Sequence, residues 1–480
     1  MAVDNYNVAF TPDQARDMLE IRHMAVTHTP KLIGPITDII GLYLGPFWYY
    51  LNLIPFVISQ GNPLSLVYFS IIIFHLFSIF IFIIISKKDK PLGTLSSSLL
   101  LLSPVAFLTT RFSFNANAVF YFSALFPVFL FFKSKKAALF EGILCGIILQ
   151  LQAAIGILFF PIAVILYCRK DKQNRHLLPL ILGFLLTLVP QIAFELNHHF
   201  LMTNALLNEF FGNSSFLGEK FSFIQIVLNR LDRFLSIFSG TTYISVVAVF
   251  SIIFLGLIIS QKKSVSRQFL NTNLILIGVF FVFFLFFPYN LKDWYLYGLV
   301  PFTVYSFASA LNIIWKKLSI RFISIIVFLW IIFASFSANF NYLQTIANNP
   351  SNDPSNLQNM MNTIDTVYTI AGHQSFIVYN YLPSVYDYGY QYLFWWYGTK
   401  KYGYQPAEIA YLPNVPEYIK NNQVYWTKKK TDPHITFLII QHDQAAPKRE
   451  YDWRGKFPES KEIKNLPWNT TIEKLDTLVN

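Results

Sequence analysis

Long apolar runs follow one another between residues 63 and 340, separated by short polar stretches. A helix needs about 20 consecutive apolar residues to cross a bilayer. The pattern therefore predicts about ten membrane-spanning helices, although only a short stretch around Gln152 divides the two runs between Ala137 and Tyr167. The predicted ranges are Leu64–Ser86, Leu92–Thr110, Ala116–Phe132, Ala137–Leu151, Ala153–Tyr167, Leu177–Leu196, Thr241–Ser260, Leu270–Pro288, Trp294–Trp315 and Arg321–Phe340.

The residues before these runs have a different pattern. In residues 1–62, Pro12 and the acidic residue after it indicate the start of a helix. The aromatic stretch Tyr43–Leu51 suits a helix lying among lipid headgroups. We expect residues 1–62 to form an outer loop with amphipathic helices.

Residues 341–480 indicate a small α/β domain. Short β-branched and aromatic runs predict strands over Phe376–Tyr379 and Ile435–Ile440, and Asp387–Tyr397 between them is typical of an aromatic-rich helix. Four rings of this helix could stack on sugars, although packing into the core of the domain is the favoured interpretation. They are Tyr388, Tyr390, Trp395 and Trp396. The predicted fold class is mostly α, a polytopic transmembrane helical bundle with a small extracytoplasmic α/β C-terminal domain.

The composition agrees with an integral membrane protein. Hydrophobic residues make up 54% of the chain and charged residues only 13%, so too little polar surface is present to cover a water-soluble particle. The same composition disfavours a disordered chain and a nucleic-acid-binding protein. The two cysteines, Cys145 and Cys168, lie in apolar runs and imply no disulfide framework.

Basic residues gather in every second loop between the runs. Five short loops hold 16 of the 37 Lys and Arg residues, with only Asp89 and Asp171 as acids. The positive-inside rule places these loops in the cytoplasm, which leaves residues 1–63, the loop 197–240 and the tail on the outer face. Because residues 1–63 contain no signal-peptide pattern, we expect a further span upstream of them. The basic residues are Lys87, Lys88, Lys90, Lys133, Lys135, Lys136, Arg169, Lys170, Lys172, Arg175, Lys262, Lys263, Arg267, Lys316, Lys317 and Arg321.

Polar and ionisable side chains cluster at the outer ends of the predicted spans. Such groups are costly near a membrane core, so their positions point to function, although each could also cap a helix end or extend to the interface. We expect five separate segments to meet in one site. They hold Asp13, Arg16 and Asp17; Arg111, Asn115 and Asn117; Gln150 and Gln152; Glu195, Asn197, His198 and His199; and Lys292, Asp293, Trp294 and Tyr295.

The motifs of nucleotide-using and metal-dependent soluble enzymes are missing from the sequence. His198 and His199 are adjacent and do not share a helix face, and no Gly-rich phosphate loop or nucleophile elbow occurs. A carboxylate beside cations at the outer membrane boundary suits a substrate with its tail in lipid and a charged phosphate in its head group.

The order of these motifs resembles that of multi-pass GT-C glycosyltransferases, and in pattern the bacterial protein O-mannosyltransferase and aminoarabinose-transferase types. The likeness lies in Asp13–Asp17, Gly34-Pro35, Leu44–Leu51, Thr110–Asn117, Phe194–Phe200, Trp294–Tyr297 and Pro301. The resemblance implies a membrane enzyme that transfers a hexosyl or pentosyl group from a polyprenyl-phosphate donor. It places the glycan, lipid or protein acceptor on the outer face of the cytoplasmic membrane, and it also implies an additional first span.

Departures from the family pattern concern metal binding. The family's first acidic residue falls on Asp13, but its usual Glu partner is Gln14 in this sequence. Leu44-Gly45-Pro46 stands where some relatives have Glu-Lys-Pro, and Gln152 stands where a His is often found. No cofactor is therefore expected, and a divalent metal ion stays an open alternative that the sequence does not support.

The resemblance makes Asp13 the candidate general base and assigns nearby cations to the departing phosphate. Asp13 could instead serve only to favour the dipole of its helix. A transporter or flippase of polyprenyl-linked glycans, and a glycan ligase or polymerase of another fold, stay open as alternatives. The predicted partners are a polyprenyl-phosphate-linked sugar, its acceptor and membrane lipid, with no nucleic acid. The predicted substrate-binding residues are Arg16, Asp17, Arg111, Asn115, Asn117, Gln152, Glu195, His199, Lys292 and Tyr295.

Overall fold

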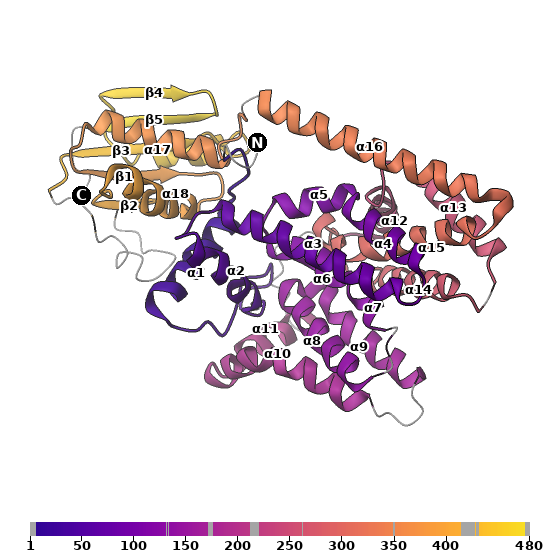
Figure 1. The fold of residues 1–480 in the computed structure, drawn as a ribbon. Helices are drawn as coiled ribbons and strands as arrows, with labels where there is room; N and C mark the ends of the chain where they lie inside the picture. The colour runs from indigo at the N-terminus through magenta and orange to yellow at the C-terminus, as the bar shows by residue number, and fades with distance from the viewer. Residues whose placement is uncertain are drawn as a thin grey trace. The chain divides into compact units, whose positions relative to one another are not determined.

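The computed structural model describes residues 6–130, 132, 134–170, 176–211, 220–261, 263–348, 351–413, 428 and 432–475. These residues are mostly helical, and a five-stranded sheet lies in the C-terminal part of the chain (Figure 1). Five of the charged residues counted above for the loops predicted to be cytoplasmic lie outside the described residues. They are Lys133, Asp171, Lys172, Arg175 and Lys262.

The chain divides into two compact units. The bundle unit comprises Thr29–Ile54 and Leu66–Phe340, and the α/β unit comprises Met1–His28, Pro55–Ser65 and Asn341–Asn480. The predicted outer loop of residues 1–62 is therefore shared by both units.

Every apolar run expected from the sequence contains helix. The helices between residues 47 and 348 are α2 (Phe47–Ile58), α3 (Leu64–Ser86), α4 (Lys90–Leu101), α5 (Pro104–Arg111), α6 (Asn115–Ser123), α7 (Phe126–Phe129), α8 (Lys135–Leu151), α9 (Ala153–Lys170), α10 (Leu177–Asn197), α11 (Leu201–Phe211), α12 (Phe223–Ser239), α13 (Val246–Ile259), α14 (Val265–Phe284), α15 (Val300–Trp315) and α16 (Arg321–Asn348), with short 3₁₀ turns at Asp293–Tyr295, Tyr297–Leu299 and Leu318–Ile320.

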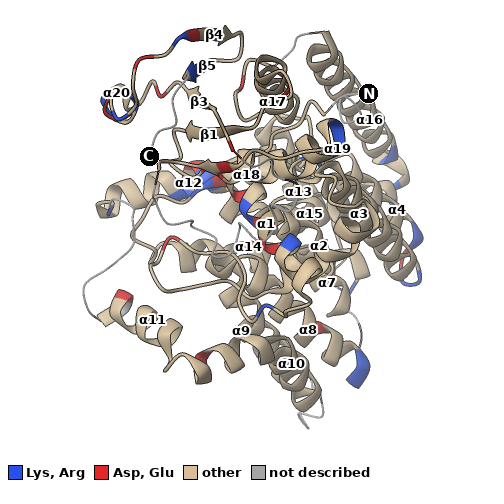
Figure 2. Cartoon of the chain, turned by 90° about the vertical axis from the view of Figure 1, so that its left-hand side faces the viewer, with Lys and Arg blue, Asp and Glu red and all other residues tan. Residues whose placement is uncertain are grey.

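In the part of the chain that the structure describes, five helices are long and apolar enough to cross a membrane, or six if α4 and α5 form one broken span. The sequence had suggested about ten, and the remaining runs form shorter helices such as α13, which begins at Val246 rather than near Thr241. Charged side chains lie mainly at helix ends and in loops, whereas α3 is tan along its length (Figure 2). The chain is a multi-pass membrane protein.

The predicted span Leu92–Thr110 is broken at a proline. Ser103 caps the second half by accepting a hydrogen bond from the amide of Ala106 at 3.1 Å, and Pro104 opens α5, which turns by 52° from α4. Proline cannot continue the hydrogen-bonding ladder of a helix, so the break has a local cause. The hydroxyl of Ser335 donates to the carbonyl of Leu102 at 2.9 Å and pairs one of the groups that the break exposes.

A buried carboxylate organises one end of the bundle unit. Asp89 caps α4 and accepts hydrogen bonds from Asn312 at 3.0 Å and from Ser266 at 3.3 Å, and Lys316 forms an ion pair with it. This acid, which the sequence places among the basic loops, thus stabilises the junction of α4, α14 and α15.

Two glycines let the loop of residues 29–46 in the bundle unit fold tightly. The amide of Gly34 donates to the carbonyl of Leu44 at 2.8 Å, and a β-carbon at Gly34 would lie 2.1 Å from the carbonyl oxygen of Gly45. A β-carbon at Gly45 would lie 2.2 Å from Cγ of Gln150. Both positions therefore require glycine because no side chain fits there.

The α/β unit is built around a mixed sheet. Its elements are α1 (Pro12–Thr27), α17 (Leu357–Ala371), β1 (Phe376–Tyr381), α18 (Tyr388–Leu393), a π-helical turn (Phe394–Gly398), α19 (Thr399–Tyr402), β2 (Glu408–Ala410), β3 (Ile435–Gln441), α20 (Pro447–Arg454), β4 (Glu462–Leu466) and β5 (Thr470–Leu475). The strand order is β2-β1-β3-β5-β4, with β2, β1 and β3 parallel and β5 antiparallel to both of its neighbours. The two predicted strands, the helix after Asp387 and the helix from Pro12 are confirmed.

Helices cover both faces of the sheet at β1 and β3. On one face Phe376 packs against Tyr368 of α17 and Phe394. On the other face Tyr381 packs against Trp453 of α20. Burial on both sides explains why β1 and β3 are continuous apolar runs without polar alternation.

The aromatic side chains pack inward more than the sequence suggested. Tyr390 and Trp396 are buried, as the favoured interpretation of that helix expected. Trp48 and Tyr49, which suited a lipid headgroup layer, are buried as well. Their burial corrects the expectation that these two rings lie at the membrane interface.

We expect Gly34→Ala to lower the free energy of unfolding by about 1–3 kcal/mol, because the new methyl group overlaps a backbone oxygen that cannot move aside. The measurement is thermal or denaturant unfolding of the purified protein in detergent. Gly278→Ala is the matched control, since no atom lies within 4 Å of a β-carbon at that position. Equal effects of the two substitutions would contradict the close-approach argument.

Candidate functional site

The first group of candidate residues lies at the start of α1 in the α/β unit. Pro12 opens the helix, and the side chain of Gln14 accepts a hydrogen bond from the amide of Thr11 at 2.9 Å. Gln14 is buried, and its hydrogen bond to Thr11 makes it a helix cap. It stands where the resembling glycosyltransferases have a second acid.

Arg16 links the two acids of this group. Its Nη1 lies 2.8 Å from Oδ1 of Asp13, while its Nε and Nη2 donate to Oδ1 of Asp17 at 3.0 and 2.8 Å. Asp17 is 3% exposed and anchors the guanidinium, whereas Asp13 is 54% exposed. Asp13 is thus the carboxylate of the pair that solvent or a substrate can reach.

The second group lies in the bundle unit and contains a residue that the sequence reasoning missed. The carboxylate of Asp38 accepts hydrogen bonds from Nζ of Lys292 at 3.0 Å and from the hydroxyl of Tyr295 at 2.9 Å. Asp38 is the single acid of residues 29–46, and it lies in the loop with the Gly34-Pro35 and Gly45-Pro46 motifs. Its position between these two motifs is the feature of the sequence that could have identified it.

Neighbouring side chains hold Lys292 and Tyr295 in place. Arg233 of α12 forms an ion pair with Asp293 at 2.5 Å, and Nζ of Lys292 lies 5.3 Å from the centre of the Trp294 ring. A cation at this distance from an aromatic face is stabilised by the ring's quadrupole. The ammonium group is therefore held by Asp38 on one side and by the Trp294 ring on another.

Arg230, also on α12, fixes the backbone that leads to this group. Its buried guanidinium donates to the carbonyls of Phe284 at 3.0 Å and of Phe287 and Tyr289 at 2.6 Å. Burial lowers the pKa of Arg230 to about 10, which still leaves it charged at neutral pH. The arginine satisfies carbonyls at the end of α14 that would otherwise lack partners.

Glu195 braces the turn between α10 and α11. Its carboxylate accepts hydrogen bonds from the amides of Met202 at 2.8 Å and Thr203 at 2.9 Å, and from the Thr203 hydroxyl at 2.5 Å. His199 lies in this turn, exposed and with a positive φ of 52°. Glu195 thus has a structural role, and His199 is presented to solvent.

The other predicted residues mostly pair with backbone. Asn115 donates to the carbonyl of Leu151 at 2.7 Å, and Asn117 donates to that of Phe112 at 2.8 Å. Arg111 lies over the ring of Phe107 at 5.2 Å, and Gln152 is buried at the end of α8. Asn117 thus stabilises its own turn, and Asn115 links that turn to the end of α8.

Contacts within the bundle unit connect the polar turns to one another. Oε1 of Gln150 accepts from the amide of Phe47 at 3.1 Å, Asn115 reaches Leu151, and the rings of Tyr43 and Phe194 lie 6.1 Å apart. Among the described residues, no three His, Cys, Asp or Glu side chains gather as metal ligands. The candidate cation of the bundle unit is therefore the Lys292 ammonium group, which Asp38 holds at the end where these turns meet.

We expect Glu195→Gln to destabilise the turn by about 1 kcal/mol, because one amide donor would then face another and a charge-assisted bond is lost. Thermal unfolding and limited proteolysis near His199 measure the effect. Asp232→Asn is the control, since Asp232 is 75% exposed and lies 3.9 Å from the nearest Arg233 nitrogen. Unchanged proteolysis in Glu195→Gln would refute the bracing role.

No family model and no curated protein matches this chain. Two crystal structures of ArnT from Cupriavidus metallidurans do match its fold. The structure bound to undecaprenyl phosphate has a TM-score of 0.57 and 10% identity, covering 98% of this chain and 95% of ArnT. The apo structure has a TM-score of 0.55 and 11% identity, covering 98% and 96%. The chain therefore shares the ArnT fold over nearly its whole length.

Proposed function

We propose that the chain is a glycosyltransferase that transfers a sugar from a polyprenyl-phosphate donor to an acceptor on the outer face of the cytoplasmic membrane. The observation that carries the proposal is the match along 98% of the chain to ArnT, whose crystal structure was obtained with undecaprenyl phosphate bound. An exposed carboxylate at Asp13 and an oriented ammonium at Lys292 are the groups that such a reaction needs.

In the proposed reaction Asp13 is the general base. The acceptor hydroxyl oxygen attacks C1 of the sugar, the bond between C1 and the phosphate oxygen breaks, and polyprenyl phosphate leaves with the bonding electrons. The hydroxyl proton passes to Asp13, which Arg16 orients through their contact at 2.8 Å. Attack opposite the leaving group inverts the anomeric centre, as the resemblance to GT-C glycosyltransferases implies.

Lys292 is the favoured partner of the departing phosphate. Asp38, Trp294 and Tyr295 hold its ammonium group, so little reorganisation is needed when negative charge develops on the leaving oxygen. Asp38 acts as a positioning residue in this scheme, and the Tyr295 hydroxyl orients Asp38. Arg16, Arg111 and His199 remain further candidates for the phosphate.

The proposed orientation puts the Lys292 group outside the cell and the Asp89 group inside. Lys292 precedes α15, and Lys316, which pairs with Asp89, follows it. Between them, the 16 residues of α15 span about 24 Å, most of the thickness of a bilayer core. The basic loops then lie in the cytoplasm.

Asp13→Asn should reduce transfer by about 100-fold or more, the usual contribution of a positioned general base. The assay follows sugar release from a labelled polyprenyl-phosphate sugar in membranes, which also separates a transferase from a flippase. Asp232→Asn serves as the carboxylate control. Near-normal transfer by Asp13→Asn, at normal expression, would remove Asp13 from the mechanism.

Lys292→Ala should reduce transfer by about tenfold or more, since a charge-assisted contact to phosphate contributes about 1.5–3 kcal/mol. Lys292→Arg should recover part of the activity because it keeps the charge. The same assay and expression control apply. Identical loss in both variants would indicate that the site needs the shape of lysine rather than a cation.

A further inference from the structure

The carboxyl ends of the parallel strands in the α/β unit form a topological switch point. The chain leaves β1, forms β2 on one side of it, and later forms β3 on the other side. The chain segments that follow β1 and β3 therefore leave the sheet in different directions beside Tyr381, the last residue of β1. In open α/β sheets, ligands bind in the crevice that this divergence opens.

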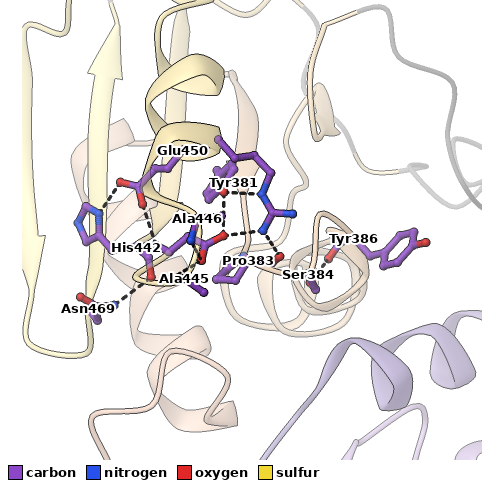
Figure 3. Close-up of polar contacts among 11 residues, drawn as sticks. Tyr381, Pro383, Ser384, Tyr386, His442, Ala445, Ala446, Glu450 and Asn469 are labelled. Atoms are coloured by element: carbon purple, nitrogen blue, oxygen red, sulfur yellow. Dashed lines mark hydrogen bonds and ion pairs between the residues drawn. The ribbon is translucent and has the colours of Figure 1, made fainter. Parts of the chain in front are cut away.

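An ion-pair network lies at this edge (Figure 3). Nη2 of Arg449 lies 2.5 Å from the carboxylate of Asp443, which is 3% exposed, and 2.6 Å from the carbonyl of Pro383. Nε of Arg449 donates to the Tyr381 hydroxyl at 3.0 Å, and that hydroxyl donates to Asp443 at 3.0 Å. The Arg449 guanidinium holds the pKa of Asp443 below its usual value, so the pair stays ionised at neutral pH.

The same carboxylate fixes the start of α20. Oδ1 of Asp443 accepts from the amides of Ala445 at 3.1 Å and Ala446 at 3.0 Å. Glu450 accepts from His442 at 2.7 Å and from the amide of Asp443 at 2.7 Å (Figure 3). These hydrogen bonds attach the start of α20 to the residues that follow β3. The other side chains of α20 therefore project from a helix whose start is fixed.

A cavity of about 600 Å³ lies beside this network and is open to solvent. Its charged lining consists of Lys448, Arg449 and Lys456 with one acid, Asp452. Lys448 and Lys456 are exposed and form no ion pair with any residue that the structure describes. Nη1 of Arg449 likewise donates to none of the described residues. Arg449 pairs with Asp443 through Nη2, and the two lysines outnumber the one acid of the lining, so the cavity carries a net positive charge.

Aromatic rings complete the lining. Tyr411, which follows β2, and Trp453 of α20 both line the cavity, and the indole of Trp453 donates to the carbonyl of Tyr411 at 2.9 Å. A hydrogen-bonded ring beside cations offers an apolar face and fixed polar groups in one place, which is the usual composition of a small-molecule site. Trp453 is only 2% exposed and packs beside Tyr411, so the half-buried Tyr411 ring is the apolar surface for the C–H face of a sugar. The cations suit a carboxylate or phosphate on that sugar.

We propose that the cavity at the carboxyl ends of β1 and β3 binds a saccharide that carries an anionic group. Lys448 and Lys456 attract the anion, Arg449 contributes Nη1, and Tyr411 supports the sugar ring. Its use as a holding site for an acidic acceptor rests on the proposed glycosyl transfer, but the binding itself does not.

The test is calorimetric titration of the full-length protein in detergent, without any donor. The probes are trigalacturonic acid, a phosphorylated maltotriose and neutral maltotriose. We expect an acidic probe to bind at least fivefold more tightly than the neutral one, and the preferred acid to identify the anion. Lys448→Ala with Lys456→Ala should weaken that binding at least fivefold.

Lys461→Ala with Lys464→Ala is the matched control, because both lysines are exposed at β4 and neither lines the cavity. Unchanged thermal unfolding of both double variants shows that the fold is intact. Equal binding of acidic and neutral probes, no binding of either acid, or an unweakened cavity variant would overturn the proposal. Because no donor is present, such a failure would leave the transfer reaction untouched.

Discussion

The end of the bundle unit that carries Lys292 depends on the amide of Gln150. A polar group that is almost fully buried must be paired, and this one accepts from the amide of Phe47 at 3.1 Å and donates to the carbonyl of Thr187 at 2.6 Å. The backbone of Gly45 lies directly against its side chain. One side chain of α8 thus fixes α10 and the loop that carries Asp38, so the position of Lys292 depends on contacts far from it in the sequence.

The fold could be predicted from the sequence where a hydrophobic pattern follows directly from the surroundings of the segment. Apolar runs indicated the positions of the helices, whose apolar side chains face either the membrane or the protein interior. β-branched and aromatic runs indicated β1 and β3, which are buried. Breaks inside runs were harder to see. Pro104 was visible in the sequence, yet whether a proline bends a span or ends it depends on partners such as Ser335, which lies 233 residues away from Leu102. Strands β2, β4 and β5 were not predicted. β2 has only three residues, β4 is largely exposed and lacks an apolar pattern, and β5 is buried although most of its residues are polar.

The residues of the candidate site could be predicted from the sequence only in part. Residue type identified Asp13, Arg16 and Lys292 as groups able to handle a proton or a phosphate. It could not separate them from Asn115 and Asn117, whose amides are equally polar but donate to the backbone carbonyls of Leu151 and Phe112. Asp38 was overlooked because a single acid in a loop carries no signal of its partners. Its role follows only from the folding of residues 29–46 onto the bundle unit.

The two edges of the sheet have a further consequence. A sheet edge with unpaired backbone groups can recruit a strand from another molecule. Here β2 has only three residues, and β4 carries Glu462 and Lys464 on exposed positions. Short length on one side and charge on the other discourage intermolecular strand pairing, so many copies of this unit could crowd a membrane surface without aggregating through their sheets.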